Sequence, residues 1–540
     1  MTDVPIVVQQ THHEHDQWWK AGVIYQIYPR SFQDSKGDGI GDLHGIAGRL
    51  DYLAWLGVDA IWISPIFPSP MADFGYDVAD YRGVDSIFGT LEDFERLLAA
   101  AHARKIQVLL DFVPNHTSDQ HPWFIEARRS RDSPMRDMYI WRDPAPGGGP
   151  PNNWLSDFGG SAWEWDERTE QYYYHAYLRQ QPDLNWRNPA VRAKMYDVLR
   201  YWLERGVDGF RVDVLWHLVK DDQFRNNPPN PDWAPGMPPH KKVLQLYSAD
   251  RPEVHEIVSE MRSVLAEYGD DRLLIGEIYL PLARLVAYYG RDLGGAHVPF
   301  NFHLIQAAWH ARSLQREIQE YEAAIPEGGW PNWVLSNHDK PRIVARVGPA
   351  QARVAAMLLL TLRGTPTIYY GDEIGMDNVE ILQSQVMDPF ERNVPGQGFG
   401  RDPQRTPMQW SRGLNAGFTS GSPWLPLSPK AHEINVDAES TNPASMLSLY
   451  RRLLALRREH RALTVGRYQP VKASGDVLAF AREAARERFL VALNLGPAPA
   501  ELPVPWRARV VLSTHNDRNG EKVRSSLLLR ENEGILAVVQ

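Results

Sequence analysis

The chain of 540 residues contains no cysteine. This absence excludes disulfide bonds, a cysteine nucleophile and any metal centre held by thiolates. Long runs of Lys and Arg are also missing, and 58 basic against 67 acidic side chains leave a formal net charge of −9. We therefore expect neither a nucleic acid nor an anionic membrane surface as a partner.

Long apolar stretches are missing as well. No stretch approaches the roughly 18 apolar residues of a membrane-spanning helix, and Met1–Asp16 has no continuous apolar segment of the kind found in secretory signals. We therefore expect a cytoplasmic protein with no membrane segment. Apolar residues at 43% and charged residues at 23% are typical of a folded chain, and its length predicts more than one domain.

Aromatic residues are abundant, with 19 Trp, 22 Tyr and 17 Phe. They can fill a large core, or they can line a pocket that stacks against flat faces such as those of sugars. Composition alone leaves both interpretations open.

Short apolar runs alternate with helical patterns through the first two thirds of the chain. The predicted strands are Val23–Tyr28, Ala60–Ile63, Ile106–Phe112, Val207–Val212, Leu273–Glu277, Trp333–Asn337 and Thr365–Tyr370, and the predicted helices are Leu43–Leu56, Leu91–Ala103, Pro189–Arg205, Val254–Tyr268 and Arg353–Leu362. This rhythm predicts an α/β fold with a parallel sheet. The number of units favours a (β/α)8 TIM barrel.

Two parts of the chain break the rhythm. Residues 113–187 are rich in aromatics and glycine without clean alternation, and we expect them to form a subdomain inserted after the third strand. After residue 462 short β-like runs such as Val477–Ala481 and Phe489–Leu493 predict an antiparallel domain. The predicted domains are a catalytic barrel from residues 1–112 and 188–462, the subdomain 113–187, and a C-terminal β-sandwich from 463–540.

Acidic residues stand at the ends of four predicted strands: Asp111, Asp213, Glu277 and Asp339. A single acid before a loop is commonplace, but strand ends converge on one face of a barrel, so four in order indicate a catalytic site. Arg211 lies two residues before Asp213 on the same strand, so both point to one face. We expect Arg211 to lower the pKa of Asp213 and keep it ionised.

These four segments resemble the short motifs of glycoside hydrolase family 13, the α-amylase clan. The similarity covers nearly the whole chain and includes Gln26–Phe32, Gly37–Leu43, Gln181–Asn185 and Arg405–Trp410. The chain looks most like the α-glucosidase and oligo-1,6-glucosidase group. The resemblance implies a retaining, exo-acting α-glucosidase that releases glucose from the non-reducing ends of short α-glucosides, without a cofactor for the chemistry.

The resemblance also implies catalytic roles. Asp213 matches the nucleophile that forms a glucosyl–enzyme intermediate, and Glu277 matches the acid that protonates the leaving oxygen and then activates water. Asp339 is expected to bind two sugar hydroxyls and to distort the ring. Glu277 needs surroundings that raise its pKa, because an acid must keep its proton near neutrality.

The same resemblance implies the residues that bind the sugar. His116 and His338 are expected to bond glucose hydroxyls, Tyr76 to stack under the ring, and Asp77 to bind its terminal hydroxyls. An arginine of the late loop is expected to pair with Asp77 and close the pocket, with Arg401 as the preferred residue and Arg405 as the alternative.

The loop from Asp34 to Asp42 places acids between glycines, a spacing that suits a hard cation bound by oxygen. In similar enzymes this loop carries Ca²⁺ or Mg²⁺, with side chains of Asp34, Asp38 and Asp42 and the carbonyl of Ile40 as ligands. Lys36 departs from the commoner Asn or Asp. It offers only its carbonyl oxygen, or its ammonium weakens or replaces the ion.

The choice of substrate stays open. Val214 follows the nucleophile, and in similar enzymes Val at this place accompanies action on α-1,6 bonds. The alternative function is a transglucosylase or isomerase of the same clan that forms trehalose or isomaltulose, although the chain has no RLDRD-like loop after Asp339. A non-catalytic transporter subunit is disfavoured because it lacks the three acids. We expect short oligosaccharides as substrates, and a monomer or a homodimer.

Overall fold

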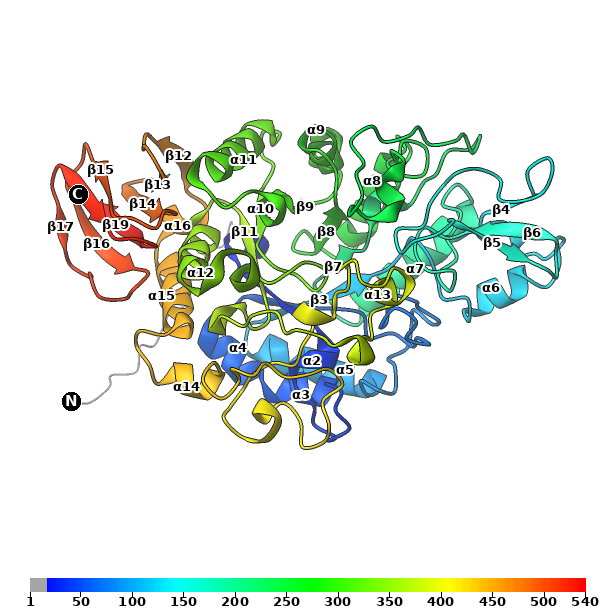
Figure 1. Ribbon diagram of the computed structural model, residues 1–540, viewed down its shortest axis with the longest axis horizontal. Coiled ribbons are helices and arrows are strands. Elements are labelled where there is room, and N and C mark those ends of the chain that lie inside the picture. The colour runs from blue at the N-terminus through cyan, green and yellow to red at the C-terminus, as the bar shows by residue number, and fades with distance from the viewer. Residues whose placement is uncertain (1–16) are drawn as a thin grey trace.

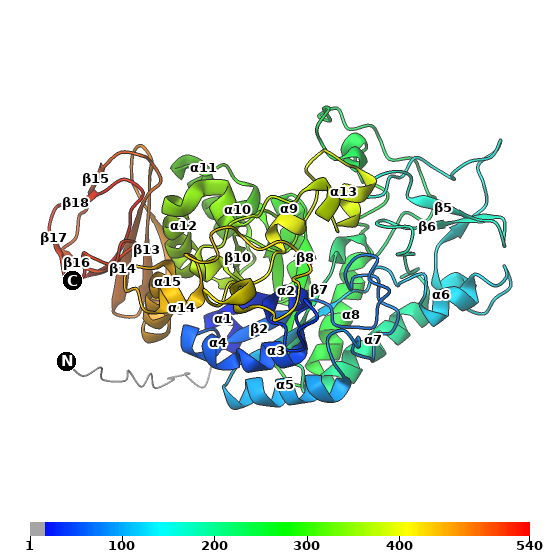
Figure 2. The same ribbon diagram turned by 60° about the horizontal axis from the view of Figure 1, so that its bottom comes forward.

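A barrel lies at the centre of the computed structural model, which describes residues 17–540. The first 16 residues, where the sequence predicts no apolar signal segment, lie outside the described residues. An inserted subdomain and a C-terminal β domain lie at opposite ends of the barrel (Figure 1 and Figure 2). The boundaries expected at residues 112, 187 and 462 stay predictions.

The barrel has eight strands within the described residues, all parallel to their neighbours. They are β1 (Ile24–Ile27), β2 (Ala60–Ile63), β3 (Gln107–Phe112), β7 (Gly209–Val212), β8 (Leu273–Ile278), β9 (Val298–Asn301), β10 (Asn332–Val334) and β11 (Thr365–Tyr369). The hydrogen-bonded order runs β10-β11-β1-β2-β3-β7-β8-β9. The backbone N–H of Asn301 donates to Oδ1 of Asn332 at 2.8 Å, which joins the two end strands and closes the ring.

The predicted TIM barrel is confirmed, and one strand was missed. Strand β9 reads Val-Pro-Phe-Asn, and a proline argues against a central strand because it cannot donate to a ladder. Pro299 is tolerated here at the last strand of the hydrogen-bonded order, where it lies opposite Gly276 of β8.

Helices surround the barrel (Figure 2). The longer ones are α5 (Leu91–Ala103), α7 (Pro189–Glu204), α8 (Val254–Ala266), α11 (Ala311–Ala324), α12 (Ile343–Thr361) and α15 (Met446–Glu459); the shorter ones are α1 (Trp18–Ala21), α2 (Pro29–Phe32), α3 (Leu43–Gly48), α4 (Leu50–Leu56), α6 (Pro122–Ala127), α9 (Leu282–Leu285), α10 (His303–Gln306), α13 (Pro389–Asn393), α14 (Val436–Ser440) and α16 (Arg461–Thr464). Thr90 and Asp93 form a capping box that fixes the start of α5. The helix expected over Leu43–Leu56 is broken at Arg49 into α3 and α4.

Helix α12 begins ten residues before the predicted start at Arg353, with a bend at Gly348. Among residues 17–540 it is the one helix whose length and composition would suit a membrane span. No apolar stretch of that length is expected from the sequence. The apolar window of α12 is 61% buried inside the structure. Packing between the barrel and the C-terminal domain therefore accounts for its apolar character.

The inserted subdomain contains the three-stranded sheet β4-β6-β5, formed by Trp141–Arg142, Gln171–Tyr174 and Trp163–Asp166. Trp154, Trp163 and Tyr174 make its small core, so many of the aromatics here serve packing.

The C-terminal domain is antiparallel, as predicted. Its larger sheet has the order β12-β13-β14-β19-β16-β17, and a second sheet pairs β15 with β18. The strands are β12 (Arg467–Val471), β13 (Val477–Ala484), β14 (Glu487–Asn494), β15 (Ala500–Pro503), β16 (Ala508–Ser513), β17 (Lys522–Val523), β18 (Ser526–Leu529) and β19 (Gly534–Val539). Leu490, Leu527 and Ile535 pack between the two sheets.

Close backbone contact at the start of β7 makes Gly209 a sensitive position. A Cβ there would lie 2.2 Å from the carbonyl oxygen of Leu273 on β8. We expect Gly209→Ala to lower the melting temperature, because such a clash costs about 1–3 kcal/mol. Gly48→Ala is the control: a Cβ there meets nothing within 4 Å, and we expect no loss of stability. Equal shifts in a thermal melt would contradict this account of β7.

Candidate active site

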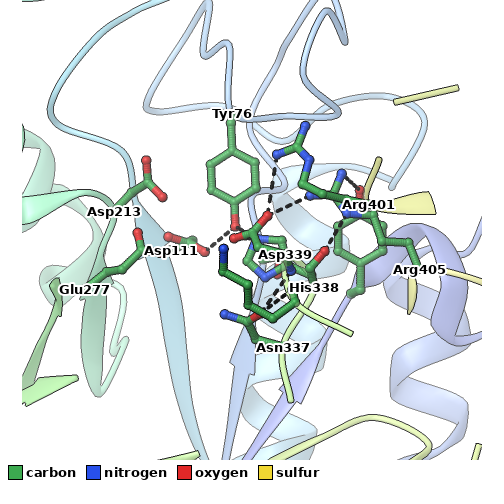
Figure 3. A network of polar contacts seen from close by, with 12 residues as sticks. Tyr76, Asp111, Asp213, Glu277, Asn337, His338, Asp339, Arg401 and Arg405 are labelled. Atoms are coloured by element: carbon green, nitrogen blue, oxygen red, sulfur yellow. Dashed lines mark hydrogen bonds and ion pairs between the residues drawn. The ribbon is translucent and has the colours of Figure 1, made fainter. Parts of the chain in front are cut away.

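A buried arginine joins three carboxyl groups at the carboxyl ends of three adjacent strands. Nη1 of Arg211 on β7 lies 2.7 Å from Oδ1 of Asp111 on β3 and 2.7 Å from Oδ1 of Asp213. Its Nη2 lies 2.7 Å from Oε2 of Glu277 on β8. Figure 3 shows the carboxyl groups of Asp213 and Glu277 beside each other. The strand ends thus bring together three of the acids that the sequence singles out.

One cation does not balance three buried carboxylates. Burial raises the pKa of Asp213 well above its usual value, although the charge of Arg211 opposes the shift. Burial likewise raises the pKa of Glu277, and it raises the pKa of Asp111 to about 6. The expected lowering of the Asp213 pKa is therefore wrong, because Arg211 is shared and desolvation outweighs it. The cluster as a whole favours holding a proton.

The backbone directly after β7 adopts a strained conformation that brings an N–H group to Glu277. Val214 has a φ of 39°, a left-handed value that is uncommon for a β-branched residue. In this conformation the N–H of Val214 donates to Oε2 of Glu277 at 2.9 Å. The strain fixes one oxygen of Glu277 and leaves the other free for a reacting group.

A chain of hydrogen bonds runs from Gln26 through His338 and Tyr76 to Asp111. Nε2 of Gln26 donates to Nδ1 of His338 at 2.8 Å, so the proton of the neutral ring is on Nε2. His338 Nε2 lies 2.7 Å from the hydroxyl of Tyr76, which donates to Asp111 at 3.0 Å. The rings of Tyr76 and His338 stack with centroids 5.4 Å apart. Burial lowers the pKa of His338, which keeps it neutral.

Asp339 lies on the other side of His338, between two arginines (Figure 3). Its Oδ1 accepts from Arg405 at 2.9 Å and lies 3.4 Å from Arg401, while Oδ2 lies 3.2 Å from His338 Nε2. These neighbours hold the pKa of Asp339 well below its usual value. Its side chain is 22% exposed, against 9% for Asp213 and 3% for Glu277, so Asp339 faces the open part of the site.

The late arginine pairs with a different aspartate from the one expected. Nη2 of Arg401 lies 2.5 Å from Oδ1 of Asp73, and its Nε donates to Asp388 at 2.7 Å. Asp77 instead accepts the backbone N–H groups of Ala72 and Asp73 at 2.8 and 2.9 Å, which folds its own loop. The expected contact of Arg401 or Arg405 with Asp77 is therefore wrong.

His116 is buried beside the same loop. Its Nε2 lies 3.0 Å from the carbonyl oxygen of Tyr76, and its ring packs 5.5 Å from that of Tyr177. Both ring nitrogens have protein partners, since Asn115 contacts Nδ1 at 3.2 Å. Its expected bond to glucose stays a prediction.

Sequence reasoning missed several groups of the site. Asp73 and Asp388 are fully or nearly fully buried, yet each lies in a loop where no periodicity marks it. Tyr177 belongs to the subdomain, and its pKa is raised by burial and also by the charges of Asp213 and Glu277, which places it near the acids. The one available signal for Asp73 was its position in the segment of Tyr76 and Asp77.

The predicted cation loop is satisfied by its own chain. Asp34 accepts N–H groups of Lys36, Gly37 and Gly39 at 2.8 Å, and the hydroxyl of Thr419. Asp42 accepts from Ser35 and Gly45. Within residues 17–540 no group of three His, Cys, Asp or Glu side chains is arranged to hold a metal. The expected ligand set of Asp34, Lys36, Asp38, Ile40 and Asp42 is not assembled.

The comparison with known families agrees with this geometry. A model of the α-amylase catalytic domain matches residues 26–466. The chain belongs to the α-amylase family. The match spans the barrel from within β1 to beyond β11 and includes every acid described above, so this protein is an enzyme built on a glycosidase catalytic domain.

Similar proteins include glucosidases and glucosyl transfer enzymes. An oligo-1,6-glucosidase of Heyndrickxia coagulans is 42% identical, over 93% of this chain and 96% of that protein. A probable α-glucosidase of Rhizobium meliloti (strain 1021) is also 42% identical, over 92% and 93%. Among solved structures, an α-glucosyl transfer enzyme is 41% identical with a TM-score of 0.92, over 97% and 100% of the two chains. The trehalulose synthase of Pseudomonas mesoacidophila MX-45 is 37% identical with a TM-score of 0.89, over 97% and 99%.

The ammonium of Lys36 lies 3.0 Å from the carbonyl oxygen of Ile87 and 3.3 Å from that of Ser86. It therefore ties the loop to the neighbouring segment of residues 86 and 87. We expect neither EDTA nor added Ca²⁺ to move the melting temperature by more than about 1 °C, because an ion that does not bind the folded state cannot stabilise it. Lys36→Asn removes this tie and adds an oxygen ligand, so its melting temperature should be lower and should rise with Ca²⁺. A rise of several degrees in the unaltered enzyme with Ca²⁺ would contradict this prediction.

Proposed function

We propose that the protein is a retaining, exo-acting α-glucosidase that releases glucose from short α-glucosides. The observation that carries this proposal is the pair of carboxyl groups, Asp213 and Glu277, held by one guanidinium at the strand ends. Retaining hydrolysis needs one carboxylate to attack the anomeric carbon and a second group to protonate the leaving oxygen. Relatives named oligo-1,6-glucosidase and α-glucosidase support the same substrate class.

The assignment of roles follows from the contacts of Arg211. Its Nη1 makes a hydrogen bond to Asp213, which favours the negative charge there. Its Nη2 is close to Glu277, yet it makes no aligned hydrogen bond. We therefore propose Asp213 as the ionised nucleophile and Glu277 as the acid that carries the proton, with Arg211 favouring the charge on Asp213 although burial raises the pKa of both acids.

The reaction then has two steps. An oxygen of Asp213 attacks C1 of glucose as the bond from C1 to the leaving oxygen breaks, and Glu277 gives its proton to that oxygen. Glu277 next removes a proton from water, whose oxygen attacks C1 and releases Asp213. Two inversions leave glucose with its original α configuration. Asp339, held between Arg401 and Arg405, is proposed to accept hydrogen bonds from ring hydroxyls.

The pocket is proposed to close around a single terminal glucose. Asp73, Arg401 and Asp388 form a continuous buried ion pair chain from the loop after β2 to helix α13. Phe158 of the subdomain packs 5.2 Å from Phe390 of α13 and lies under Arg401. These links join three segments over one end of the site, which favours binding a chain end over binding a chain interior.

Transfer of glucose to another sugar is the second candidate activity. It uses the same covalent intermediate, with an acceptor hydroxyl in place of water. Solved relatives include an α-glucosyl transfer enzyme and a trehalulose synthase, and their names support transfer as a candidate activity. Cytoplasmic location, oligomeric state and the preference for α-1,6 bonds suggested by Val214 stay predictions.

Substitution of either acid tests the mechanism. We expect Asp213→Asn and Glu277→Gln each to lower kcat for maltose by on the order of 10³-fold or more, because each removes a group needed in the transition state. Melting temperatures of both variants serve as the folding control. For Glu277→Gln, an activated 4-nitrophenyl α-glucoside should lose less in the glucosylation step, since its leaving group needs little protonation. Ordinary turnover in either variant would remove that residue from its role.

Product analysis tests the reaction type. We expect maltose, isomaltose or 4-nitrophenyl α-glucoside to yield glucose, and proton NMR should detect the α anomer first. At high sugar concentration, chromatography should detect transfer products as a minor fraction. Early release of the β anomer would exclude retention. Isomerised or transferred sugar as the main product at low concentration would favour the transglucosylase.

A further inference from the structure

Lys340 is a charged group of the site for which the mechanism has no use. It follows Asp339 directly, and its backbone N–H donates to Oδ1 of Asn337 at 2.8 Å. Its ammonium lies over the ring of Tyr279, 5.2 Å from the centroid. Across residues 17–540 we find no hydrogen bond from this ammonium and no carboxylate within 4.0 Å of it. Three N–H donors are thus held at the site without a protein acceptor.

The fold holds Lys340 in place, so its position is not that of a free surface lysine. The side chain of Tyr279 stacks on Phe302 at 4.1 Å and meets Trp216 edge-on at 5.6 Å. Asn337 also contacts the Tyr279 hydroxyl at 3.3 Å. Burial lowers the pKa of Lys340, which is the direction expected of an ammonium that lacks a close partner.

Lys340 lies on the side from which the leaving group departs. The tyrosine under its ammonium comes two residues after Glu277, the proposed acid, at the end of β8. The ion pair chain through Asp73 and Arg401 closes another part of the pocket. A substituent on the leaving group would therefore pass close to the ammonium.

A second unpaired cation lies nearby. Lys241 belongs to a 3₁₀ turn, Pro239–Lys242, in the loop after β7, and its charge is among those that act on Lys340. Within the described part of the chain its ammonium has no hydrogen bond and no ion pair either. His240 bonds the carbonyl oxygen of Asp157, which anchors this turn to the subdomain. Lys241 therefore adds a positive charge from a second loop, on an exposed turn that is held by the subdomain.

The negative charges around the two lysines are already engaged. Asp339 is bound by Arg401 and Arg405, and Glu277 enters the reaction with its proton. Repulsion of an incoming anion by these acids is thereby reduced, and two free ammonium groups remain to attract it. A neutral sugar hydroxyl would be attracted much less strongly than an anion by these positive charges.

We propose that Lys340, with Lys241 as an auxiliary positive charge, forms a subsite for an anion on the leaving group. The substrate class is then an α-glucoside whose leaving group carries a carboxylate or a phosphate. This inference rests on the proposed α-glucosidase function and adds the chemistry of the leaving group to it.

Matched substrate pairs test the subsite. The first pair is α-glucosylglycerate and α-glucosylglycerol, which differ by a carboxylate; the second is α-glucosylglycerol and its phosphate ester on the glycerol. We expect kcat/KM at low ionic strength to favour at least one anionic member by about tenfold, chiefly through KM, and added salt to weaken the preference. The two pairs distinguish a carboxylate from a phosphate as the recognised group. Equal or lower kcat/KM for both anionic substrates would overturn the inference.

Variants assign the preference to the lysines. Lys340→Gln should abolish it while kcat/KM for α-glucosylglycerol changes by less than about threefold, Lys340→Arg should retain it, and Lys241→Gln should reduce it. Lys242→Gln is the matched control, because it removes the same charge from the turn of Lys241 while its ammonium lies over Trp233 and not over Tyr279, and the preference should stay.

An unchanged preference in Lys340→Gln would reject the role of this residue, as would a shifted pH profile for neutral substrates with the ratio intact. Hydrolysis of neutral glucosides without any anionic preference would refute the subsite alone. Failure to hydrolyse any α-glucoside would refute the proposed function itself.

Discussion

The charge of one buried guanidinium is the constraint on which the site depends. Arg211 is 1% exposed and contacts carboxyl groups from three strands. Three carboxylates in such a place without a cation would be very costly to bury. With one cation the cluster is still short of positive charge, so the pKa of each of the three acids is raised. The arginine that permits burial of the acids is therefore also the group that limits how far their pKa values rise.

The barrel and its strand-end acids were predictable because strands have a strict period. Alternation of side chains along a strand places Arg211 and Asp213 on one face, and parallel strands bring their ends together. Loops have no such period. The sequence therefore predicted Asp77 as the partner of the late arginine, whereas Asp73 contacts Arg401 in the structure. The two aspartates are four residues apart in one turn and both are buried, and only the folded loop decides which one contacts Arg401. Strand β9 was missed for a related reason, since Pro299 hides a strand whose position is fixed by its neighbours.

The cation loop shows a second limit of sequence patterns. Acids at alternate positions count potential ligands, but they do not say which donors will reach those oxygens first. In this fold the N–H groups of the glycine-rich turn and the hydroxyl of Thr419 bond to Asp34. Lys36 then reaches across to the carbonyl groups of residues 86 and 87. One unusual residue in the pattern was thus more informative than the acids that matched it.

The distribution of cations around the pocket is uneven, and this unevenness has a chemical meaning. Arg401 and Arg405 are each committed to carboxylates, so they shape the end of the pocket proposed for glucose. Arg211 is committed to the catalytic acids. Lys340 and Lys241 alone among these charges lack such commitments within the described chain. Lys340 is half-buried at the site, and its ammonium forms no ion pair with residues 17–540 that would stabilise the fold. Its partner is therefore best sought outside the chain, on the group that leaves from Glu277.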